Sequence, residues 1–360
     1  MIVIKKKNVE IFQKSNGSLN KLVGPLVSIV TTAYNNEKFN EKYFDSLNNQ
    51  TYRKFEVIFV DNLSPDKTRE DAIRRLKNGK IVYSKINLGC AGGNNLGVKE
   101  AKGKYIFLLG PDTHVDSKCI ERLVHSAKSS DNYIYAPRQM TYDGKSLIGC
   151  GIATDIFGYP RKTYEKNGTL LTQKLFYADG TGIFMTRKNY IKIGGMDEGT
   201  FLFAEDVELS WRAHLHGMGL VPVMDSIVYH WSGGAVGVGG FPKGKVYETN
   251  SHRRFLAEKN IIRNILKNYQ WWNLFWGLPM YLSINILEMI TLFLVGQRHA
   301  ISKTYLKAYW WNIQNFKSTL IERRKIQKSR TVGDRHIFKL MTFFPSKFRI
   351  IKEIGIPKIN

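Results

Sequence analysis

The sequence predicts an α/β fold in which a mostly parallel, Rossmann-like sheet is flanked by helices. Three observations lead to this class. From Leu26 onward, short runs of β-branched and aromatic residues alternate with helical stretches, which is the pattern of βαβ units. Polar residues follow each of the first four expected strands, as in sheets that bind ligands beyond their carboxyl ends. Finally, 43% of the 360 residues are hydrophobic, which is enough for a packed core and excludes a disordered chain.

The expected elements follow one another in a regular order. Strands are predicted over residues 26–32, 55–60, 81–84 and 105–109, and helices over residues 37–48, 66–77 and 93–102 lie between them. A helix over 117–130 is followed by an irregular, β-rich stretch to residue 177. A helix over 203–217 ends at Gly217, because glycine is favoured after the last helical turn. A strand over 221–229 and a glycine-rich loop to residue 244 complete this part.

Charge divides the chain into two parts. The formal net charge is +24, from 54 Lys and Arg against 30 Asp and Glu. From Asn250 to the last residue there are 20 basic and 5 acidic residues, so most of the excess lies there. We therefore predict an N-terminal extension over 1–25, an α/β domain over 26–250 and a basic helical region over 251–360. The excess predicts an anionic partner: nucleic acid, a phosphorylated small molecule or an acidic membrane surface.

The most apolar stretch of the chain covers residues 271–296, and three tryptophans lie at its start. As one helix it would measure about 39 Å, which is enough to cross a bilayer core. However, Asn285, Glu288 and Thr291 would form a polar stripe on one side, which favours a helix lying in the membrane interface or packing on protein. The sequence leaves both arrangements open, a single span and a peripheral attachment. The basic patch over 323–330 would suit an anionic membrane surface or a solvated helix face.

The cysteines and the start of the chain indicate a location. Cys90, Cys119 and Cys150 lack the spacing of a zinc or redox site and are too few for a disulfide scaffold, which fits a reducing compartment. No apolar run of signal-peptide length follows the lysines at residues 5–7. We therefore expect the protein at the cytoplasmic face of the cell membrane, either peripheral or with a single span.

Polar residues after the expected strands predict a ligand site. They are, in chain order, Tyr34 and Asn35, Asp61 and Asn62, Asn87 and Gly89, and Asp112. Because the carboxyl ends of parallel strands meet at one edge of the sheet, these residues are expected close together. The alternative is that Asn, Asp and Gly only form turns and helix caps at these positions.

Seven short segments resemble, in order, the motifs of inverting family 2 glycosyltransferases of the GT-A fold, especially the rhamnosyltransferase-like branch. The segments begin at Val27 (VSIVTTAYN), Val60 (VDNLSPD), Asn87 (NLGCAGGNNLG), Gly110 (GPDT), Gly194 (GGMDE), Glu205 (EDVELSWR) and His230 (HWSGG). The resemblance covers about residues 27–264. It implies a GT-A domain over 26–250 that transfers a sugar from a nucleotide-diphosphate donor to a hydroxyl of a glycan or lipid-linked glycan, as in cell-surface polysaccharide biosynthesis.

The resemblance also implies a divalent metal, Mg²⁺ or Mn²⁺, held against the donor diphosphate. Asp112 occupies the last position of the family's D-x-D motif, and His230 matches a metal-contacting histidine of some members. The sequence departs from the motif at Gly110, where the first acidic residue would stand. A hard cation suits phosphate and carboxylate oxygens together. The alternatives are that Asp112 is a turn residue and that His230 only packs beside Trp231.

Asp206, with Glu205 beside it, matches the position that supplies the general base in similar enzymes. A carboxylate can accept the proton of an acceptor hydroxyl within hydrogen-bond reach. The alternative is an acidic helix start, where carboxylates favour the positive end of the helix dipole and Glu208 pairs with Arg212. That alternative accounts for Glu208 better than for the other two, because an apolar run over 201–204 precedes them.

The residues that the resemblance assigns to the nucleotide sugar come from several motifs. They are Thr32, Tyr34, Asn35, Asp61, Asn87, Gly89, Asn94, Asp179, Gly180, Trp211 and Arg212. Asp61 matches the residue that recognises the base, and Asp179 with Gly180 matches the segment that lines the donor sugar. Trp211 is weighed against a place in the core, where a tryptophan at helical spacing is commonly found.

Two other functions remain open on the sequence. A catalytically silent glycan-binding or scaffold protein on the same fold is compatible with Gly110. A basic nucleic-acid-binding protein is less favoured, because the sequence contains no zinc pattern, RNP-like strand or basic zipper. The leading expectation is thus an enzyme whose partners are a nucleotide sugar, a glycan acceptor and an anionic membrane surface, and not nucleic acid.

Overall fold

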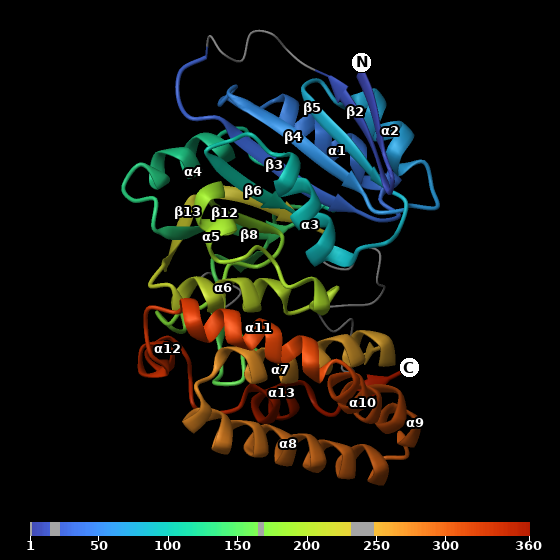
Figure 1. The fold of residues 1–360 in the computed structure, drawn as a ribbon, viewed down its shortest axis with the longest axis vertical. Coiled ribbons are helices and arrows are strands. Elements are labelled where there is room, and N and C mark those ends of the chain that lie inside the picture. The colour runs from blue at the N-terminus through green and yellow to red at the C-terminus, as the bar shows by residue number, and fades with distance from the viewer. Residues whose placement is uncertain (1, 15–21, 165–168, 232–247) are drawn as a thin grey trace.

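The computed structural model describes residues 2–14, 22–164, 169–231 and 248–360. The strands gather in the N-terminal part of the molecule, and the C-terminal part is helical (Figure 1). The two parts meet where α6 (Glu205–Leu215) lies against α7 (Ser251–Asn268).

A large mixed sheet forms the N-terminal part. Within the described residues its strand order is β1-β2-β5-β4-β3-β6-β12-β8-β13-β7, and β9 pairs with β8. The strands are β1 (Ile2–Lys6), β2 (Val9–Lys14), β3 (Val27–Ala33), β4 (Phe55–Asp61), β5 (Gly79–Ser84), β6 (Tyr105–Leu109), β7 (Thr113–Val115), β8 (Tyr133–Thr141), β9 (Leu147–Gly149), β12 (Gly182–Thr186) and β13 (Gly219–His230). The central strands β5, β4, β3 and β6 are parallel, and β12 is antiparallel to β6.

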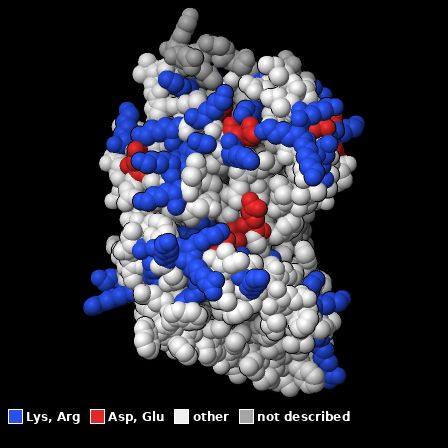
Figure 2. Space-filling model, in the orientation of Figure 1, with Lys and Arg blue, Asp and Glu red and all other residues white. Residues whose placement is uncertain are grey.

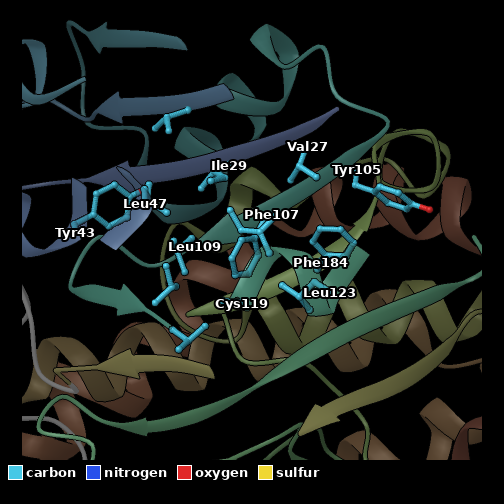
Figure 3. Close-up of a cluster of buried hydrophobic side chains, with 14 of the residues drawn as sticks. Val27, Ile29, Tyr43, Leu47, Tyr105, Phe107, Leu109, Cys119, Leu123 and Phe184 are labelled. Atoms are coloured by element: carbon cyan, nitrogen blue, oxygen red, sulfur yellow. The ribbon is translucent and has the colours of Figure 1, made fainter. Parts of the chain in front are cut away.

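Helices cover both faces of the sheet. They are α1 (Glu37–Asn48), α2 (Thr68–Arg75), α3 (Gly89–Glu100), α4 (Cys119–Ala127) and α5 (Arg187–Lys192). Successive residues of β3 enter different cores: Ile29 packs with Phe107 and Leu123 on one face, and Val30 packs on the other (Figure 3). A strand buried on both faces needs a continuous apolar run, which is why the predicted strands were easy to recognise. The predicted mostly parallel sheet flanked by helices is confirmed.

The structure adds detail to the sequence prediction in three places. Within the expected N-terminal extension, β1 and β2 form a hairpin, and β2 pairs antiparallel with β5. Helix α3 begins at Gly89 rather than at residue 93. The stretch predicted as irregular and β-rich contains β8, a nine-residue strand whose partners β12 and β13 lie far along the chain. Pairing over such distances leaves little local signal. The predicted loop to residue 244 lies mostly outside the described residues.

The C-terminal part is built around α7. The other elements are α8 (Trp271–Leu294), α9 (Arg298–Ala300), the π-helix η3 (Ile301–Leu306), α10 (Lys307–Gln314), α11 (Phe316–Ser329), α12 (Asp334–Leu340) and α13 (Ser346–Ile354). Helices α8, α10 and α11 all contact α7. Short strand pairs join β10 (Ala153–Thr154) to β11 (Pro160–Arg161) and β14 (Glu248–Thr249) to β15 (Lys358–Ile359). Among the described residues, α8 is the one helix long and apolar enough to cross a membrane.

Candidate functional site

The turn between β6 and β7 carries Asp112, and β13 carries His230 beside it. Strands β7 and β13 are antiparallel, and the amide of Trp231 donates to the carbonyl of Asp112 at 3.1 Å. The two side chains therefore meet, with Asp112 Oδ2 3.4 Å from His230 Nε2. Burial would lower the pKa of His230, but the hydrogen bond and charge of Asp112 raise it overall.

The chain before β12 brings Asp179 to the same edge. The amide of Gly110 donates to the carbonyl of Thr181 at 3.2 Å. The segment that contains Asp112 therefore lies next to the segment that contains Asp179. Asp179 Oδ1 accepts from the amide and the hydroxyl of Thr181, which fixes its side chain. The negative charge of Asp179 also acts on His230.

Asp206 stands at the first turn of α6 and faces this edge. Its Oδ2 accepts from the amide of Gly180 at 2.9 Å, and its Oδ1 accepts from the amide of Val207 at 2.7 Å. Glu205 is buried beside it, and its Oε2 has no hydrogen-bond partner among the described residues. Burial, then the charges of Glu205 and Asp179, raise the pKa of Asp206 well above its usual range. The edge thus gathers carboxylates that repel one another, a common arrangement at catalytic sites.

The backbone around the site is strained. Five non-glycine residues of the described chain have positive φ, and all of them lie in turns at this edge: Asn35 (52°), Leu63 (65°), Phe201 (64°), Phe203 (68°) and Ala204 (58°). Such conformations persist only where surrounding contacts hold them, and they gather at functional sites. Three of the five come directly before Glu205 and Asp206, so the approach to the predicted base is the most constrained.

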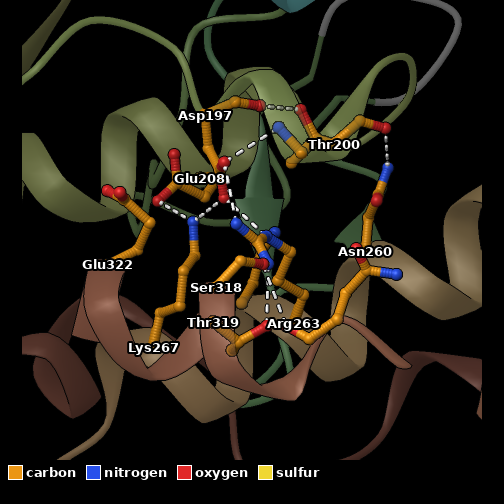
Figure 4. Close-up of polar contacts among 12 residues, drawn as sticks. Asp197, Thr200, Glu208, Asn260, Arg263, Lys267, Ser318, Thr319 and Glu322 are labelled. Atoms are coloured by element: carbon orange, nitrogen blue, oxygen red, sulfur yellow. Dashed lines mark hydrogen bonds and ion pairs between the residues drawn. The ribbon is translucent and has the colours of Figure 1, made fainter. Parts of the chain in front are cut away.

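Helix α7 supplies the contacts that hold this approach. Asn260 Nδ2 donates to the carbonyls of Thr200, Leu202 and Phe203 at 2.9, 2.9 and 2.6 Å. One turn further on, Asn264 donates to the carbonyl of Ala204 at 3.3 Å. Figure 4 shows Asn260 directed at this segment from α7. A helix of the C-terminal part therefore fixes the segment that leads to Asp206.

A buried ion cluster supports the same contact between α6 and α7. Lys267 lies between Asp197 and Glu208, 2.9 Å from Glu208, and Arg263 Nε is 2.7 Å from Asp197 Oδ2 (Figure 4). Although burial would raise the pKa of Asp197, Lys267 and Arg263 hold it far below its usual range. The carboxylates are therefore ionised and depend on these cations.

Replacing Lys267 by Met is expected to destabilise the fold by about 3 kcal/mol, because it leaves buried carboxylates with less compensation. Urea unfolding followed by circular dichroism measures this change. Lys317→Met, at an exposed position of α11, is the matched control and should change stability by less than about 0.5 kcal/mol. An equally small change in Lys267→Met would show that the cluster does not secure α6.

The turns after β3 and β4 form a second group of predicted residues. Asp61 is buried, and its Oδ1 accepts from the amide of Ser64 at 3.0 Å. The amide of Asn35 donates to the Ser64 hydroxyl at 3.1 Å, which joins the two turns. Tyr34 is exposed beside them. Burial raises the pKa of Asp61, while its contacts with Ser64 and the charge of Arg69 oppose the rise. Tyr34, Asn35 and Asp61 therefore lie together, as predicted for one pocket.

The glycine-rich segment forms a turn that is held by side-chain acceptors. The amides of Leu88 and Gly89 donate to the side chains of Asn62 and Asn87 at 2.9 Å each. The amide of Ala91 donates to the carbonyl of Phe201. These amides already have protein acceptors, so Asn87 and Gly89 build the turn and do not offer these donors to a phosphate.

Thr32 and Asn94 also make contacts within the protein. A Cβ on Gly93 would stand 2.2 Å from Thr32 Cγ2, so this glycine lets α3 pack closely on β3. Asn94 Nδ2 donates to the carbonyl of Cys90 at 3.0 Å. Both residues lie at the edge of the sheet where the ligand is predicted, and their contacts hold α3 against β3 there.

Trp211 and Arg212 are both buried within the protein. Trp211 has no exposed surface and packs against Phe176 and Tyr269, which agrees with the place in the core that was weighed for it. Arg212 forms an ion pair with Glu208 and donates to the carbonyl of Gly195. The structure therefore engages both side chains in contacts within the protein. The pairing of Glu208 with Arg212 agrees with the structural alternative considered for this helix.

Asp112 and His230 fit a divalent metal that is completed by a ligand. Neighbouring ligands bound about 2.1 Å from an octahedral ion stand about 3 Å apart, close to the 3.4 Å between Asp112 Oδ2 and His230 Nε2. Among the described residues there is no group of three His, Cys, Asp or Glu side chains that could hold an ion alone. Within the described part of the chain, Asp112 and His230 would supply two ligands, and diphosphate oxygens and water would supply the others.

The sequence does not predict the structural roles of two residues, Asn62 and Asn260. Asn62 was noted only as a turn residue, yet it links the turns after β4 and β5 through its contacts with Asn87 and Gly89. Asn260 gave no signal, because it lies in a helix outside the motifs. The neighbouring motif positions could have suggested Asn62, whereas only the packing of α7 reveals Asn260.

Comparison with known proteins agrees with this geometry. Residues 28–194 match the family model described as glycosyl transferase family 2. The uncharacterized glycosyltransferase EpsJ of Bacillus subtilis is 28% identical over 197 residues, which are 52% of this chain and 53% of EpsJ. TuaG of Bacillus subtilis, a candidate teichuronic acid biosynthesis glycosyltransferase, is 27% identical over 151 residues, 35% of this chain and 60% of TuaG. The chain spans about half the length of EpsJ and a smaller share of several other relatives.

Two solved structures share the fold. GalNAc-T7 with UDP, GalNAc and Mn²⁺ superposes with a TM-score of 0.59 at 16% identity, over 93% of this chain and 60% of that one. The mannosyltransferase PcManGT of Pyrobaculum calidifontis, in complex with GDP-Man and Mn²⁺, has a TM-score of 0.50 at 14% identity, over 85% and 86%. Both curated relatives carry the name glycosyltransferase. Residues 28–194, a little under half of the chain, thus resemble glycosyl transferase family 2, and the described domain has the GT-A fold.

Proposed function

We propose that this protein transfers a sugar from a nucleotide-diphosphate donor to a hydroxyl group of a glycan or lipid-linked glycan. The observation that carries the proposal is the meeting of Asp112, Asp179 and Asp206 at one edge of the sheet, next to the turns of Tyr34 and Asp61. The first group suits a diphosphate, a metal and a reacting hydroxyl, and the second suits a nucleoside. The rhamnosyltransferase-like branch is our preferred branch within the family, on the motifs alone.

A divalent metal is part of this proposal. Asp112 and His230 would hold Mg²⁺ or Mn²⁺ together with the donor diphosphate, and the metal would stabilise the negative charge of the leaving group. The presence of Mn²⁺ in the structures of GalNAc-T7 and PcManGT supports this assignment. Gly110 leaves Asp112 as the carboxylate of the motif, so metal binding depends strongly on it.

Asp206 is the proposed general base. Its two oxygens are fixed by the amides of Gly180 and Val207, which points the carboxylate at the segment assigned to the donor sugar. Removal of the acceptor proton by Asp206 lets the acceptor oxygen attack the anomeric carbon opposite the leaving diphosphate, which inverts the configuration. A raised pKa strengthens the carboxylate as a base while it is unprotonated.

The pH dependence tests this assignment. The base must be unprotonated, so the rate is expected to fall as pH decreases through the pKa of Asp206, which lies above the usual value of about 3.9. Glu205→Gln removes a negative charge that raises this pKa, so the acidic limb of kcat/KM should move to lower pH. The exposed Glu198 provides a control, since Glu198→Gln should leave the limb in place. If Glu205→Gln leaves the acidic limb of kcat/KM in place, that limb reports the titration of a group other than Asp206.

The acceptor is proposed to be lipid-linked, at the cytoplasmic face of a membrane. The apolar helix α8 supports this location, and so does the similarity to TuaG, a candidate enzyme of teichuronic acid biosynthesis. Donor sugar and base are set by pocket shape in segments that lie partly outside the described residues.

Binding of nucleoside diphosphates tests the proposal before any acceptor is known. Isothermal titration with UDP, GDP and dTDP in the presence of Mn²⁺ should show one of them binding more tightly than the others. Absence of binding to all three, with a folded protein, would contradict a nucleotide-sugar site. Binding without turnover would favour the catalytically silent alternative.

A further inference from the structure

Helix α8 has a polar inner face that is fully engaged with the rest of the protein. Glu288 is 9% exposed and pairs with Lys347, at 2.9 Å, and with Arg254. Asn285 has no exposed surface, accepts from Lys347 at 2.7 Å and donates to Glu258 at 3.2 Å. Asn285 and Glu288 of the predicted polar stripe are therefore turned toward α7 and α13, whereas Thr291 donates to the carbonyl of Leu287 in α8 itself.

The outer face of α8 is apolar and exposed. Its large side chains are Trp271, Trp272, Phe275, Trp276, Met280, Ile286, Leu287, Ile290, Phe293, Leu294 and Val295, with exposed fractions from 39% to 83%. Only 28% of the most apolar part of α8 is buried, so most of this part lies outside the protein core. Exposed apolar patches of this extent mark binding surfaces for lipid or protein. In Figure 1, α8 forms the end of the molecule farthest from β1 to β5.

This distribution is incompatible with α8 crossing a bilayer. A span would separate Glu288 and Asn285 from Lys347, Arg254 and Glu258 and leave charged groups without partners in hydrocarbon, at high cost. While the helix keeps these contacts, only its outer face can meet lipid. A helix with one apolar face lies along a membrane surface, with that face in the boundary between headgroups and acyl chains.

Basic residues flank both ends of this face. Arg298 and Lys303 follow its C-terminal end and are exposed, and the guanidinium of Arg298 lies over the ring of Phe293. At the other end, α12 brings the exposed Arg335 and Lys339 close, because Phe338 of α12 packs against Trp276 with ring centroids 5.9 Å apart. Figure 2 shows this end of the molecule as a mostly white surface with Lys and Arg at its margin. Such residues attract anionic headgroups.

The charges favour a membrane over a second copy of this chain. Two copies that met through this face around a two-fold axis would bring the same positively charged margins together, and like charges oppose such an interface. An anionic bilayer complements the apolar centre and the positive margin at the same time.

We propose that the outer face of α8 lies in one leaflet of an anionic membrane and that the chain attaches there without crossing. This inference deepens the membrane location proposed above. Its test measures vesicle binding, which needs no catalytic activity. The membrane proposal can therefore fail while the proposed sugar transfer holds, and sugar transfer can fail while the membrane proposal holds.

Flotation with vesicles tests the surface itself. The full chain should float with vesicles of phosphatidylcholine and phosphatidylglycerol and bind pure phosphatidylcholine more weakly. The variant Phe275→Glu, Leu294→Glu should lose about tenfold or more in partitioning, because each change places a charge in the boundary region. Ile191→Glu, at an exposed apolar position of α5, is the control and should float like the parent. Equal flotation of the double variant would overturn the proposal. The proposal would also be overturned if the parent chain does not bind vesicles but forms a dimer, and if the double substitution dissociates that dimer.

Labelling of Lys317→Cys separates attachment from a span. Position 317 is exposed on α11, beyond α8 in the chain. In sealed inverted membrane vesicles from expressing cells, an impermeant maleimide should label this cysteine without detergent, above the signal of the parent chain. Protection until detergent is added would place residue 317 across the membrane and contradict the proposal.

Discussion

Asp206→Asn is expected to lower the rate of sugar transfer by about 10²- to 10⁴-fold, the range for loss of a general base. The amide keeps the shape of the carboxylate and can still accept from the Gly180 amide, but it cannot take a proton. Affinity for the nucleoside diphosphate should change little, because the nucleoside turns at Asp61 and Ser64 are formed by other strands. Steady-state kinetics and isothermal titration on the same preparation measure both effects.

The exposed Asp143→Asn serves as the matched control and should retain the parent rate. Circular dichroism establishes that the Asp206 variant is folded, which matters because Glu205 beside it is buried. A rate within tenfold of the parent would remove Asp206 as the base and direct attention to Glu205, whose Oε2 has no partner among the described residues.

Asp112→Ala should abolish the tightening of nucleoside diphosphate binding by Mn²⁺, with a loss of about tenfold or more in the metal-dependent affinity. The reason is that Asp112 is the carboxylate of the proposed two-residue ligand set, and His230, 3.4 Å from it, is the second member. Titrations with and without Mn²⁺ separate this loss from any change in metal-free binding. His230→Ala should cause a loss in the same direction.

Asp225→Ala is the control for this measurement, because Asp225 is largely exposed on β13 and belongs to the same strand as His230. Unchanged metal dependence in Asp112→Ala would place the metal elsewhere. Absence of any metal effect in the parent would show that Gly110 marks a metal-independent member of the fold.

The parts predicted from sequence depend on local signals. Burial on both faces makes the parallel strands continuous apolar runs, and short motifs mark Asp112 and Asp206 as candidate site residues. The motif around Trp211 does not show that this side chain is buried, because the rings that pack on it, Phe176 and Tyr269, are distant in the sequence. Asn260 acts on the site from outside every motif, and only the packing of α7 against the 197–206 segment reveals it.

Release of nucleoside diphosphate from nucleotide sugars tests the central claim most directly. The full chain, bound to anionic vesicles, is incubated with UDP-, GDP- and dTDP-sugars in Mn²⁺, with and without EDTA, and with membrane extract as a source of acceptor. The account predicts that at least one donor is consumed, that EDTA stops the reaction, and that Asp206→Asn does not catalyse it. Failure to consume any of the donors, by folded protein that binds nucleoside diphosphates, would contradict the assignment as a glycosyltransferase and leave a glycan-binding or scaffold role.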